Sequence, residues 1–252
     1  MKAIILAAGE GKRLRPLTNS TPKCLVKIWG KSMLERQLEQ LRKLGISDIT
    51  VVTGYCKEKI EELKINTIYN QEFDSSNMVF SLSKTLPELS LTTADQTLIL
   101  YGDIAYSDEH LASLIDSSSS SPMTVLANTK WLELWSQRLD EPLLDAETFR
   151  YDENFKLLEI GKVPSSLEQV QAQYMGMIKV KTQYLVTLLQ HYLKDATNTV
   201  TKNMYMTDLI QQVLKSDSVN VVLVAGKWIE VDTYEDYELY LNKQPTDFGL
   251  VQ

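Results

Sequence analysis

Hydrophobic and polar positions alternate in blocks along the first half of the chain, as they do in α/β proteins. The run at residues 2–8, which is apolar from Ala3 onward, has the pattern of a central strand buried on both faces, and a polar loop follows it. Residues 32–44 place their apolar side chains on one helical face, and Gly45 is suited to end that helix. Further strands are predicted at residues 49–53, 67–69 and 97–101, and further helices at residues 57–63 and 78–86. This alternation predicts a mainly parallel sheet with helices on both faces.

The second half of the chain is less regular but contains the same two element types. Strands are predicted at residues 123–127, 157–160, 175–180, 219–224 and 228–232, and helices at residues 183–193, 206–214 and 234–241. The segments 157–160 and 175–180 are expected to pair with each other. An aromatic and acidic insertion covers residues 131–151. The sequence shows no internal repeat and no linker composition, so we expect one domain over residues 1–252.

Length and charge exclude several classes of function. The 252 residues suit one large α/β domain or two small ones. The chain has 26 Lys and Arg against 33 Asp and Glu, a net charge of −7, which argues against a general affinity for nucleic acid or anionic membranes. No apolar run approaches the roughly 20 residues of a membrane span, and residues 4–8 are too few for a signal-peptide core. We expect a cytoplasmic protein that acts on small molecules, and the sequence is compatible with a homodimer.

The loop after the first strand, residues 9–13 (GEGKR), has the composition of a phosphate-binding turn. Glycine lets backbone amides approach a phosphate without a side chain in the way, and Lys12 and Arg13 add positive charge. A tight turn without a ligand would use glycine as well. Two familiar phosphate motifs do not fit, because the dinucleotide fingerprint requires glycine in place of Leu14 and the Walker loop requires glycine in place of Leu25.

Three acidic residues stand where strands are predicted to end. Asp103 follows the strand at residues 97–101, at the carboxyl edge where open α/β sheets bind their ligands. Glu230 and Asp232 are two residues apart in an extended segment, so their side chains point to the same face. Mg²⁺ prefers one or two such carboxylates together with substrate oxygens. Asp103 and Asp232 could also simply cap a turn or a helix, and Glu230 could be only a neighbour of the site.

A longer pattern connects these features. Residues 6–18 read LAAGxGxRLxPLT, and residues 21–26 read TPKCLV. Together the two parts resemble the signature of the sugar-phosphate nucleotidyltransferase superfamily. The resemblance implies a Rossmann-like, three-layer α/β sandwich with a mainly parallel mixed sheet, of the nucleotide-diphospho-sugar transferase type. It also implies an enzyme that condenses a nucleoside triphosphate with a small phosphorylated molecule and releases pyrophosphate.

The resemblance assigns roles to particular residues. The nucleotide is expected to contact Leu6, Ala8, Gly9, Glu10, Gly11 and Gly102. Arg13 and Lys23 are expected to be catalytic, with Lys23 neutralising phosphate charge at the reacting centre; the alternative for Lys23 is a solvated loop lysine. Asp103, Asp232 and Glu230 are expected to hold Mg²⁺, because an aspartate in this position and a late acidic pair do so in the superfamily.

A second block narrows the family. Residues 69–82 (YNxxFxxxNMxxSL) and residues 229–237 (IEVDxxxDY) resemble the phosphocholine cytidylyltransferase branch of the bacterial nucleotidyltransferases. The branch implies CTP as the nucleotide. By the same resemblance Asn70, Asn77 and Ser81 supply hydrogen bonds to cytosine, ribose or the phosphate of the acceptor. Asn77 is also a candidate cap for the helix that follows it.

The acceptor is expected to bind at a divergent insertion around residues 128–175. The aromatic residues that are candidates for binding the acceptor are Trp131, Trp135 and Tyr174, together with Trp228 from outside the insertion. These rings could form a cage for a quaternary ammonium group, or could pack in the core. An acceptor with an amine and a carboxylate would suit Arg138, Asp145 and Glu147 instead. Lys162 lies in a segment that resembles the superfamily's Glu-Lys-Pro element, which implies that it holds the acceptor's phosphate, although Gly161 replaces the Glu.

Three functions are compatible with these observations. The first is a Mg²⁺-dependent cytidylyltransferase that transfers CMP from CTP to a small phosphorylated amine or amino acid, such as phosphocholine, phosphoglutamine or aminoethylphosphonate, for surface polysaccharide (capsule) or lipid decoration. The second is a sugar-1-phosphate uridylyl- or thymidylyltransferase. The third, a non-catalytic nucleotide-binding regulatory domain, is disfavoured because the expected lysine and metal carboxylates are present. The histidines His110 and His191 lie in polar helical settings and are predicted at the surface.

Overall fold

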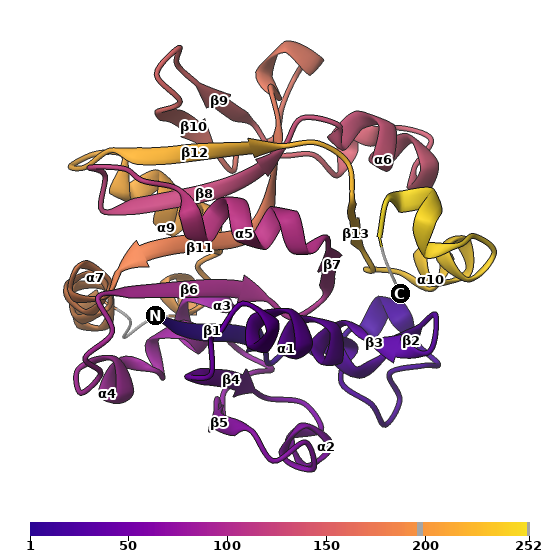
Figure 1. Ribbon diagram of the computed structural model, residues 1–252, viewed down its shortest axis with the longest axis horizontal. Helices are drawn as coiled ribbons and strands as arrows, with labels where there is room; N and C mark the ends of the chain where they lie inside the picture. The colour runs from indigo at the N-terminus through magenta and orange to yellow at the C-terminus, as the bar shows by residue number, and fades with distance from the viewer. Residues whose placement is uncertain (196–198, 251–252) are drawn as a thin grey trace.

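The computed structural model describes residues 1–195 and 199–250. Its central sheet consists of β1 (Lys2–Ala7), β4 (Ile49–Thr53), β5 (Asn66–Tyr69), β6 (Gln96–Tyr101), β8 (Met123–Asn128), β11 (Gln173–Lys181) and β12 (Val219–Val224). Within the described residues these strands form one seven-stranded sheet in the order β12-β8-β11-β6-β1-β4-β5. β11 runs antiparallel to β6 and β8, whereas the other neighbouring strands are parallel (Figure 1). The predicted mainly parallel mixed sheet is confirmed.

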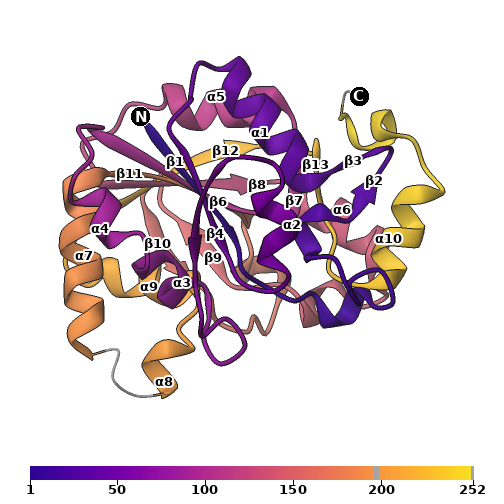
Figure 2. The same ribbon diagram turned by 90° about the horizontal axis from the view of Figure 1, so that it is seen from below.

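Helices cover both faces of this sheet (Figure 2). One layer contains α1 (Met33–Lys43), α2 (Lys57–Glu61) and α5 (Asp108–Asp116), and the opposite layer contains α3 (Met78–Ser83), α4 (Leu86–Leu89), α7 (Thr182–Asp195) and α9 (Met206–Val213). Along β1, Ile4 and Leu6 pack with α3 and α7, while Ala3 and Ile5 pack with α1 and α5. Because side chains alternate along a strand, an apolar strand suits this position between two layers. In the described part of the chain, no helix has both the length and the apolar character needed to span a bilayer.

Shorter elements surround the central sheet. The short strands are β2 (Lys27–Ile28), β3 (Lys31–Ser32), β7 (Ile104–Tyr106), β9 (Phe149–Tyr151), β10 (Leu157–Ile160) and β13 (Trp228–Glu230). The remaining helices and 3-10 turns are α6 (Trp131–Arg138), α8 (Thr199–Lys202), α10 (Tyr234–Leu241), η1 (Lys12–Leu14), η2 (Lys23–Leu25), η3 (Pro142–Leu144), η4 (Leu167–Gln169) and η5 (Pro245–Phe248). β13 pairs antiparallel with β7, which places Glu230 opposite Ile104 (Figure 1). This pairing brings the late segment of the chain beside the end of β6.

Two predictions about secondary structure are wrong in detail. The segment 157–160 forms β10, which pairs with β9 and not with β11. Both edges of β11 are already occupied by β6 and β8, so β10 has no edge of it to join. The helix predicted at residues 78–86 is divided into α3 and α4, with Pro87 in the first turn of α4. Proline has no N–H to donate into a continuing helix but is tolerated in a first turn.

The two histidines differ in their surroundings. His191 is exposed on α7, as predicted. His110 is only 4% exposed in α5, so the prediction of a surface position is wrong for this residue. His110 lies four residues before Leu114 and shares its buried helix face, an arrangement that the polar neighbours of His110 in the sequence conceal. Burial lowers the pKa of His110 to about 4, so its imidazole is neutral at physiological pH.

Candidate active site

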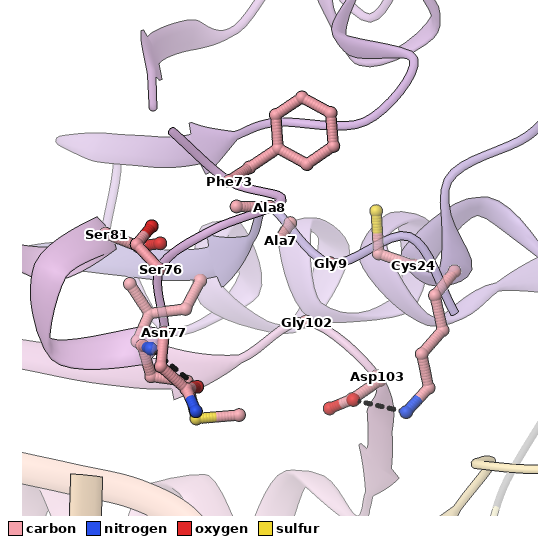
Figure 3. Close-up of a pocket in the computed structure, with 13 residues that line it drawn as sticks. Ala7, Ala8, Gly9, Cys24, Phe73, Ser76, Asn77, Ser81, Gly102 and Asp103 are labelled. Atoms are coloured by element: carbon pink, nitrogen blue, oxygen red, sulfur yellow. Dashed lines mark hydrogen bonds and ion pairs between the residues drawn. The ribbon is translucent and has the colours of Figure 1, made fainter. Parts of the chain in front are cut away.

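A pocket opens at the carboxyl ends of β1 and β6, the edge at which parallel α/β sheets bind ligands (Figure 3). In Figure 3, Ser76, Asn77 and Ser81 lie toward one end of the pocket, and Cys24 and Asp103 lie toward the other. Of the residues predicted to bind the nucleotide, the pocket brings together Leu6, Ala8, Gly9, Asn77, Ser81 and Gly102. The loop after the first strand and the Gly-Asp pair after β6 therefore share one site.

The two glycines of the loop after β1 have different surroundings. A Cβ atom on Gly9 would meet no heavy atom within 4 Å, so the backbone there faces open space. A Cβ atom on Gly11 would lie 2.8 Å from the Cβ atom of Lys23, and the φ of +68° at Gly11 favours glycine. Gly9 thus leaves room for a ligand, whereas Gly11 lets the segment that carries Lys23 pack closely. Glu10, also predicted to contact the nucleotide, pairs with basic side chains of its own loop, Lys12 at 3.3 Å and Arg15.

Lys23 joins the two acids that were predicted to bind a metal. Its Nζ atom donates to Asp103 Oδ2 at 2.6 Å and also to Asp232 Oδ1. Burial on its own would lower the pKa of Lys23, but the carboxylates of Asp103 and Asp232 outweigh burial and raise it. The ammonium group is therefore charged at any physiological pH. Arg13 lies on the solvent side of the same acids, with its Nη2 atom 3.6 Å from Asp232 Oδ1.

The turn after β13 holds Asp232 in place. The Asp236 carboxylate accepts the backbone N–H groups of Asp232 and Thr233 at 2.9 and 3.0 Å through its Oδ2 atom. The Thr233 hydroxyl in return accepts the backbone N–H of Asp236, which closes a capping box at the start of α10. Thr233, and not Asp232, is the cap of this helix. The Asp232 carboxylate therefore projects toward Lys23 from a fixed turn.

Asp103 and Asp232 suit a Mg²⁺ ion. This ion takes one or two protein carboxylates and completes its shell with water and substrate phosphate oxygens. The two carboxylates converge on the Lys23 ammonium, and Asp103 Oδ1 is buried without a hydrogen-bond partner among the described residues. Among the described residues, there is no group of three or more His, Cys, Asp or Glu side chains that could hold a metal ion by itself. The residues present fit an ion shared between two acids and the substrate, and a role for Glu230 as a ligand stays a prediction.

The polar residues of the 69–82 block form one wall of the pocket and its support. Asn70 is fully buried, and its amide donates to Ser76 Oγ and Ser81 Oγ at 3.0 Å each. It lies behind the wall and orients both hydroxyl groups. Asn77 accepts the backbone N–H of Met78 at 2.8 Å, so it caps α3 and also lines the pocket. Asn77 therefore both caps α3 and lines the pocket.

The four aromatic candidates do not form an open cage. Trp131 and Trp135 are 3% and 2% exposed and pack in the core on the α1 side of the sheet. Trp131 Nε1 donates to the carbonyl of Val170 at 3.1 Å, and the Trp135 ring lies 4.9 Å from that of Trp228. Tyr174 is buried in the apolar cluster on the opposite face. This arrangement matches the alternative interpretation of these rings as core residues.

The charged candidates of the insertion fall into two groups. Arg138 is buried and donates to Asp236 through its Nε and Nη2 atoms, and its predicted role toward the acceptor stays a prediction. Lys162 is exposed and pairs with Glu159 at 3.3 Å, and its role toward a phosphate stays a prediction. Asp145 and the half-buried Glu147 lie in the segment between η3 and β9. Burial raises the pKa of both carboxyl groups.

Comparison with known proteins identifies the family. The family model of the MobA-like NTP transferase domain matches residues 3–153. The chain belongs to the MobA-like NTP transferase domain family. A CTP:phosphoglutamine cytidylyltransferase of Campylobacter jejuni is 33% identical to this MobA-like transferase over 258 aligned residues, which cover 96% of this chain and 100% of that protein. The chain is therefore a nucleotidyltransferase, as the motifs imply.

Two further comparisons, one of sequence and one of structure, agree with this assignment of the MobA-like transferase. A choline-phosphate cytidylyltransferase of Streptococcus pneumoniae is 44% identical over 94 residues, which are 36% of this chain and 41% of that protein. The solved structure of the CTP:phosphocholine cytidylyltransferase of Streptococcus pneumoniae matches with a TM-score of 0.73 at 24% sequence identity, covering 96% of this chain and 97% of that chain. The structural likeness confirms the Rossmann-like nucleotidyltransferase fold.

Sequence reasoning missed several pocket residues of this MobA-like transferase. They are Ala7, Cys24, Phe73, Ser76 and Met78. The sequence held a signal for Phe73, because this residue belongs to the 69–82 block. In the structure, a Cβ atom on Gly54 would lie 2.5 Å from the Cβ atom of Phe73. Glycine at the end of β4 thus lets Phe73 pack over the sheet edge. Ser76 carried no signal of its own, because its place depends on the buried Asn70.

Proposed function

We propose that this protein is a Mg²⁺-dependent cytidylyltransferase. It transfers CMP from CTP to the phosphate or phosphonate group of a small amine or amino acid and releases pyrophosphate; phosphocholine, phosphoglutamine and aminoethylphosphonate represent the acceptor class. The observation that carries the proposal is the convergence of Lys23, Asp103 and Asp232 beside the pocket at the end of β1. The two relatives named for CTP-dependent transfer support the nucleotide and the acceptor class. We propose further that the reaction is cytoplasmic and serves surface polysaccharide or lipid decoration.

The transfer joins two anions, so charge neutralisation is the main task of the protein. An oxygen of the acceptor's phosphate attacks the α-phosphorus of CTP, and the bond from that phosphorus to the bridging oxygen breaks. Pyrophosphate leaves with the electron pair of this bond, so no protein nucleophile is required. Lys23 offsets negative charge at the reacting centre, and Arg13 offsets it from the solvent side. Asp103 and Asp232 would hold Mg²⁺, which adds positive charge to the phosphates when bound.

Ser81 and Asn77 are proposed to contact the nucleoside. Ser81 Oγ accepts a hydrogen bond from the Asn70 amide, which orients the hydroxyl so that it donates its own hydrogen toward the pocket. Asn77 lines the same end of the pocket (Figure 3). Phe73, which also lines the pocket, adds an apolar surface. Together these side chains offer a hydrogen-bonding and apolar setting for a base and a ribose.

Glu147 is proposed to bind the positively charged end of the acceptor. Its carboxyl group is half-buried, and burial raises its pKa; Asp208 and Asp145, both acidic, raise it further. A carboxylate in such surroundings is stabilised by an incoming cation. The pKa of Tyr101 is raised chiefly by burial, next by the neighbouring Tyr174 phenol, and then by the Glu147 carboxylate. Tyr101 is the last residue of β6, two residues before Asp103 at the carboxyl edge of the sheet.

Glu147→Gln should raise the KM for phosphocholine about tenfold, which corresponds to ~1.4 kcal/mol of binding. Glutamine retains the oxygen that accepts from the Thr207 hydroxyl at 3.3 Å but removes the negative charge. The KM for CTP should not change. Initial rates are measured with phosphocholine and with its isostere 3,3-dimethylbutyl phosphate, which keeps the phosphate but lacks the positive ammonium charge. The exposed Glu153→Gln is the matched control. An unchanged ratio between the two substrates would rule out Glu147 as the cation site.

The proposed function is tested by pyrophosphate release from the wild-type protein. CTP, UTP, dTTP, ATP and GTP are each combined with phosphocholine, phosphoethanolamine, phosphoglutamine, aminoethylphosphonate and glucose 1-phosphate. We expect Mg²⁺-dependent release with CTP and a phosphorylated amine or amino acid. A preference for UTP or dTTP with the sugar phosphate would make the protein a sugar-1-phosphate nucleotidyltransferase. Absence of release with every pair would contradict the catalytic assignment.

A further inference from the structure

Arg138, the last residue of α6, is a cation held among acids. Its side chain is only 3% exposed. Its Nε atom donates to Asp236 Oδ1 at 2.8 Å, and its Nη2 atom donates to Asp236 Oδ2 at 2.9 Å. The guanidinium also lies 4.8 Å from the centre of the Trp135 ring. A two-pronged contact of this kind fixes both the position and the rotation of the carboxylate that it binds.

The same guanidinium contacts Asp232. Arg138 Nη2 lies 3.4 Å from Asp232 Oδ2, while the other oxygen of this carboxylate accepts from Lys23. Asp236, which Arg138 holds, also accepts the backbone N–H of Asp232 at 2.9 Å. Asp232 is thus held directly through its carboxylate and indirectly through its backbone. One of its oxygens is turned to Arg138, and the other is turned to Lys23.

Arg138 also faces a third acid. Its Nη1 atom is 3.8 Å from Glu230 Oε2 and has no hydrogen-bond partner in the described part of the chain. One guanidinium therefore separates the carboxylates of Glu230, Asp232 and Asp236. Burial on its own would lower the pKa of Arg138, but the Asp236 hydrogen bonds and the Glu230 charge outweigh it, so Arg138 stays charged. Without this cation the acids would repel one another, and an uncompensated buried charge is strongly unfavourable.

We propose that Arg138 is a positioning residue for the nucleotidyl transfer. It holds the Asp232 carboxylate in the one orientation that presents Oδ1 to Lys23 and to a metal-bound nucleotide. Because Arg138 belongs to the insertion and Asp232 follows β13, the contact ties helix α6 to the metal-binding turn. The inference rests on the proposed function, since it concerns the metal acid of that reaction.

The test compares Arg138→Met, Arg138→Lys and Asp236→Asn with the wild type and with Arg42→Met, an exposed control on α1. Three quantities are measured: the Mg²⁺ concentration for half-maximal pyrophosphate release, Mn²⁺ binding to the nucleotide-free protein by electron paramagnetic resonance, and the thermal midpoint. Arg138→Met should weaken the Mg²⁺ response and Mn²⁺ binding about 10- to 100-fold, the usual effect of losing a residue that orients a metal ligand. The Mg²⁺ response and Mn²⁺ binding of Arg138→Lys should lie between those of Arg138→Met and the wild type. Lysine keeps the positive charge but cannot donate two parallel hydrogen bonds to one carboxylate as arginine does.

A purely structural role would lower the thermal midpoint and leave the metal response unchanged. If Arg138→Met is folded and responds to both metals like the wild type, the inference is wrong. If Arg138→Met does not fold, the inference is tested with Arg138→Lys and Asp236→Asn. Metal responses equal to those of the wild type in both variants would overturn the inference. If the wild type releases no pyrophosphate, the proposed function fails, while Mn²⁺ binding still compares the variants. A wild type with neither activity nor Mn²⁺ binding would overturn both.

Discussion

Asp103→Asn is expected to lower kcat about 10³-fold while the protein stays folded, because the carboxylate supplies several kcal/mol of metal-based charge neutralisation. Asp103 follows β6, and its Oδ2 atom accepts from Lys23 at 2.6 Å. Its Oδ1 atom is buried without a hydrogen-bond partner among the described residues, which leaves a lone pair for a metal. Asparagine has nearly the same shape, so the fold has little reason to change, but it lacks the negative charge that Mg²⁺ requires.

The exposed Asp116→Asn on α5 is the matched control for this substitution. It makes the same chemical change far from the carboxyl edge of the sheet, so its kcat should equal that of the wild type. Pyrophosphate release at saturating CTP and acceptor measures kcat, and the thermal midpoint verifies folding. Activity of Asp103→Asn within a few-fold of the wild type would remove Asp103 from the metal site.

Lys23→Met is expected to lower kcat about 10²–10³-fold, the range seen when one preorganised charge donor is removed from a reacting centre. Asp103 Oδ2 and Asp232 Oδ1 both contact this ammonium group. Methionine fills similar space without charge, so the two acids face each other with no cation between them. Mg²⁺ should therefore raise the thermal midpoint of the nucleotide-free variant more than that of the wild type.

The exposed Lys215→Met serves as the control for loss of a lysine, and should match the wild type in both rate and Mg²⁺ response. Rates are measured by pyrophosphate release, and midpoints by thermal unfolding with and without Mg²⁺. If Lys23→Met kept the wild-type kcat, the ammonium group would have no part in the transfer. If Mg²⁺ stabilised wild type and variant equally, Lys23 and the metal would not share the two carboxylates.

Local sequence patterns predicted those parts of the site that depend on one strand or one loop. The run at residues 2–8 was predicted as a central strand and forms β1, which pairs with β6 inside the sheet. The Gly-Asp pair after β6 was predicted at the carboxyl edge of the sheet, and both of its residues line the pocket there. The late acids were predicted as a group, but their approach to Asp103 depends on the pairing of β13 with β7. Such pairing is a contact between distant segments, which no local pattern contains.

The insertion shows where sequence reasoning was insufficient. Arg138 was assigned to the acceptor, whereas in the structure it binds Asp236. A charged residue at the end of an amphipathic helix has the same local pattern in either role. Trp131 and Trp135 are four residues apart on α6, a spacing that places them on one helix face. This spacing was an available signal for core packing. A binding cage, in contrast, needs rings from several elements with open faces.

The central claim is that the backbone at the end of β1 binds a nucleoside triphosphate, and Gly9→Val tests it most directly. A Cβ atom on Gly9 would meet no heavy atom within 4 Å, so we expect the variant to fold with a thermal midpoint close to that of the wild type. Calorimetric titration with CTP in the presence of Mg²⁺ should show binding to the wild type and a loss of affinity of about tenfold or more in the variant, or ~1.4 kcal/mol and above. Equal CTP affinity in the two proteins would contradict the account.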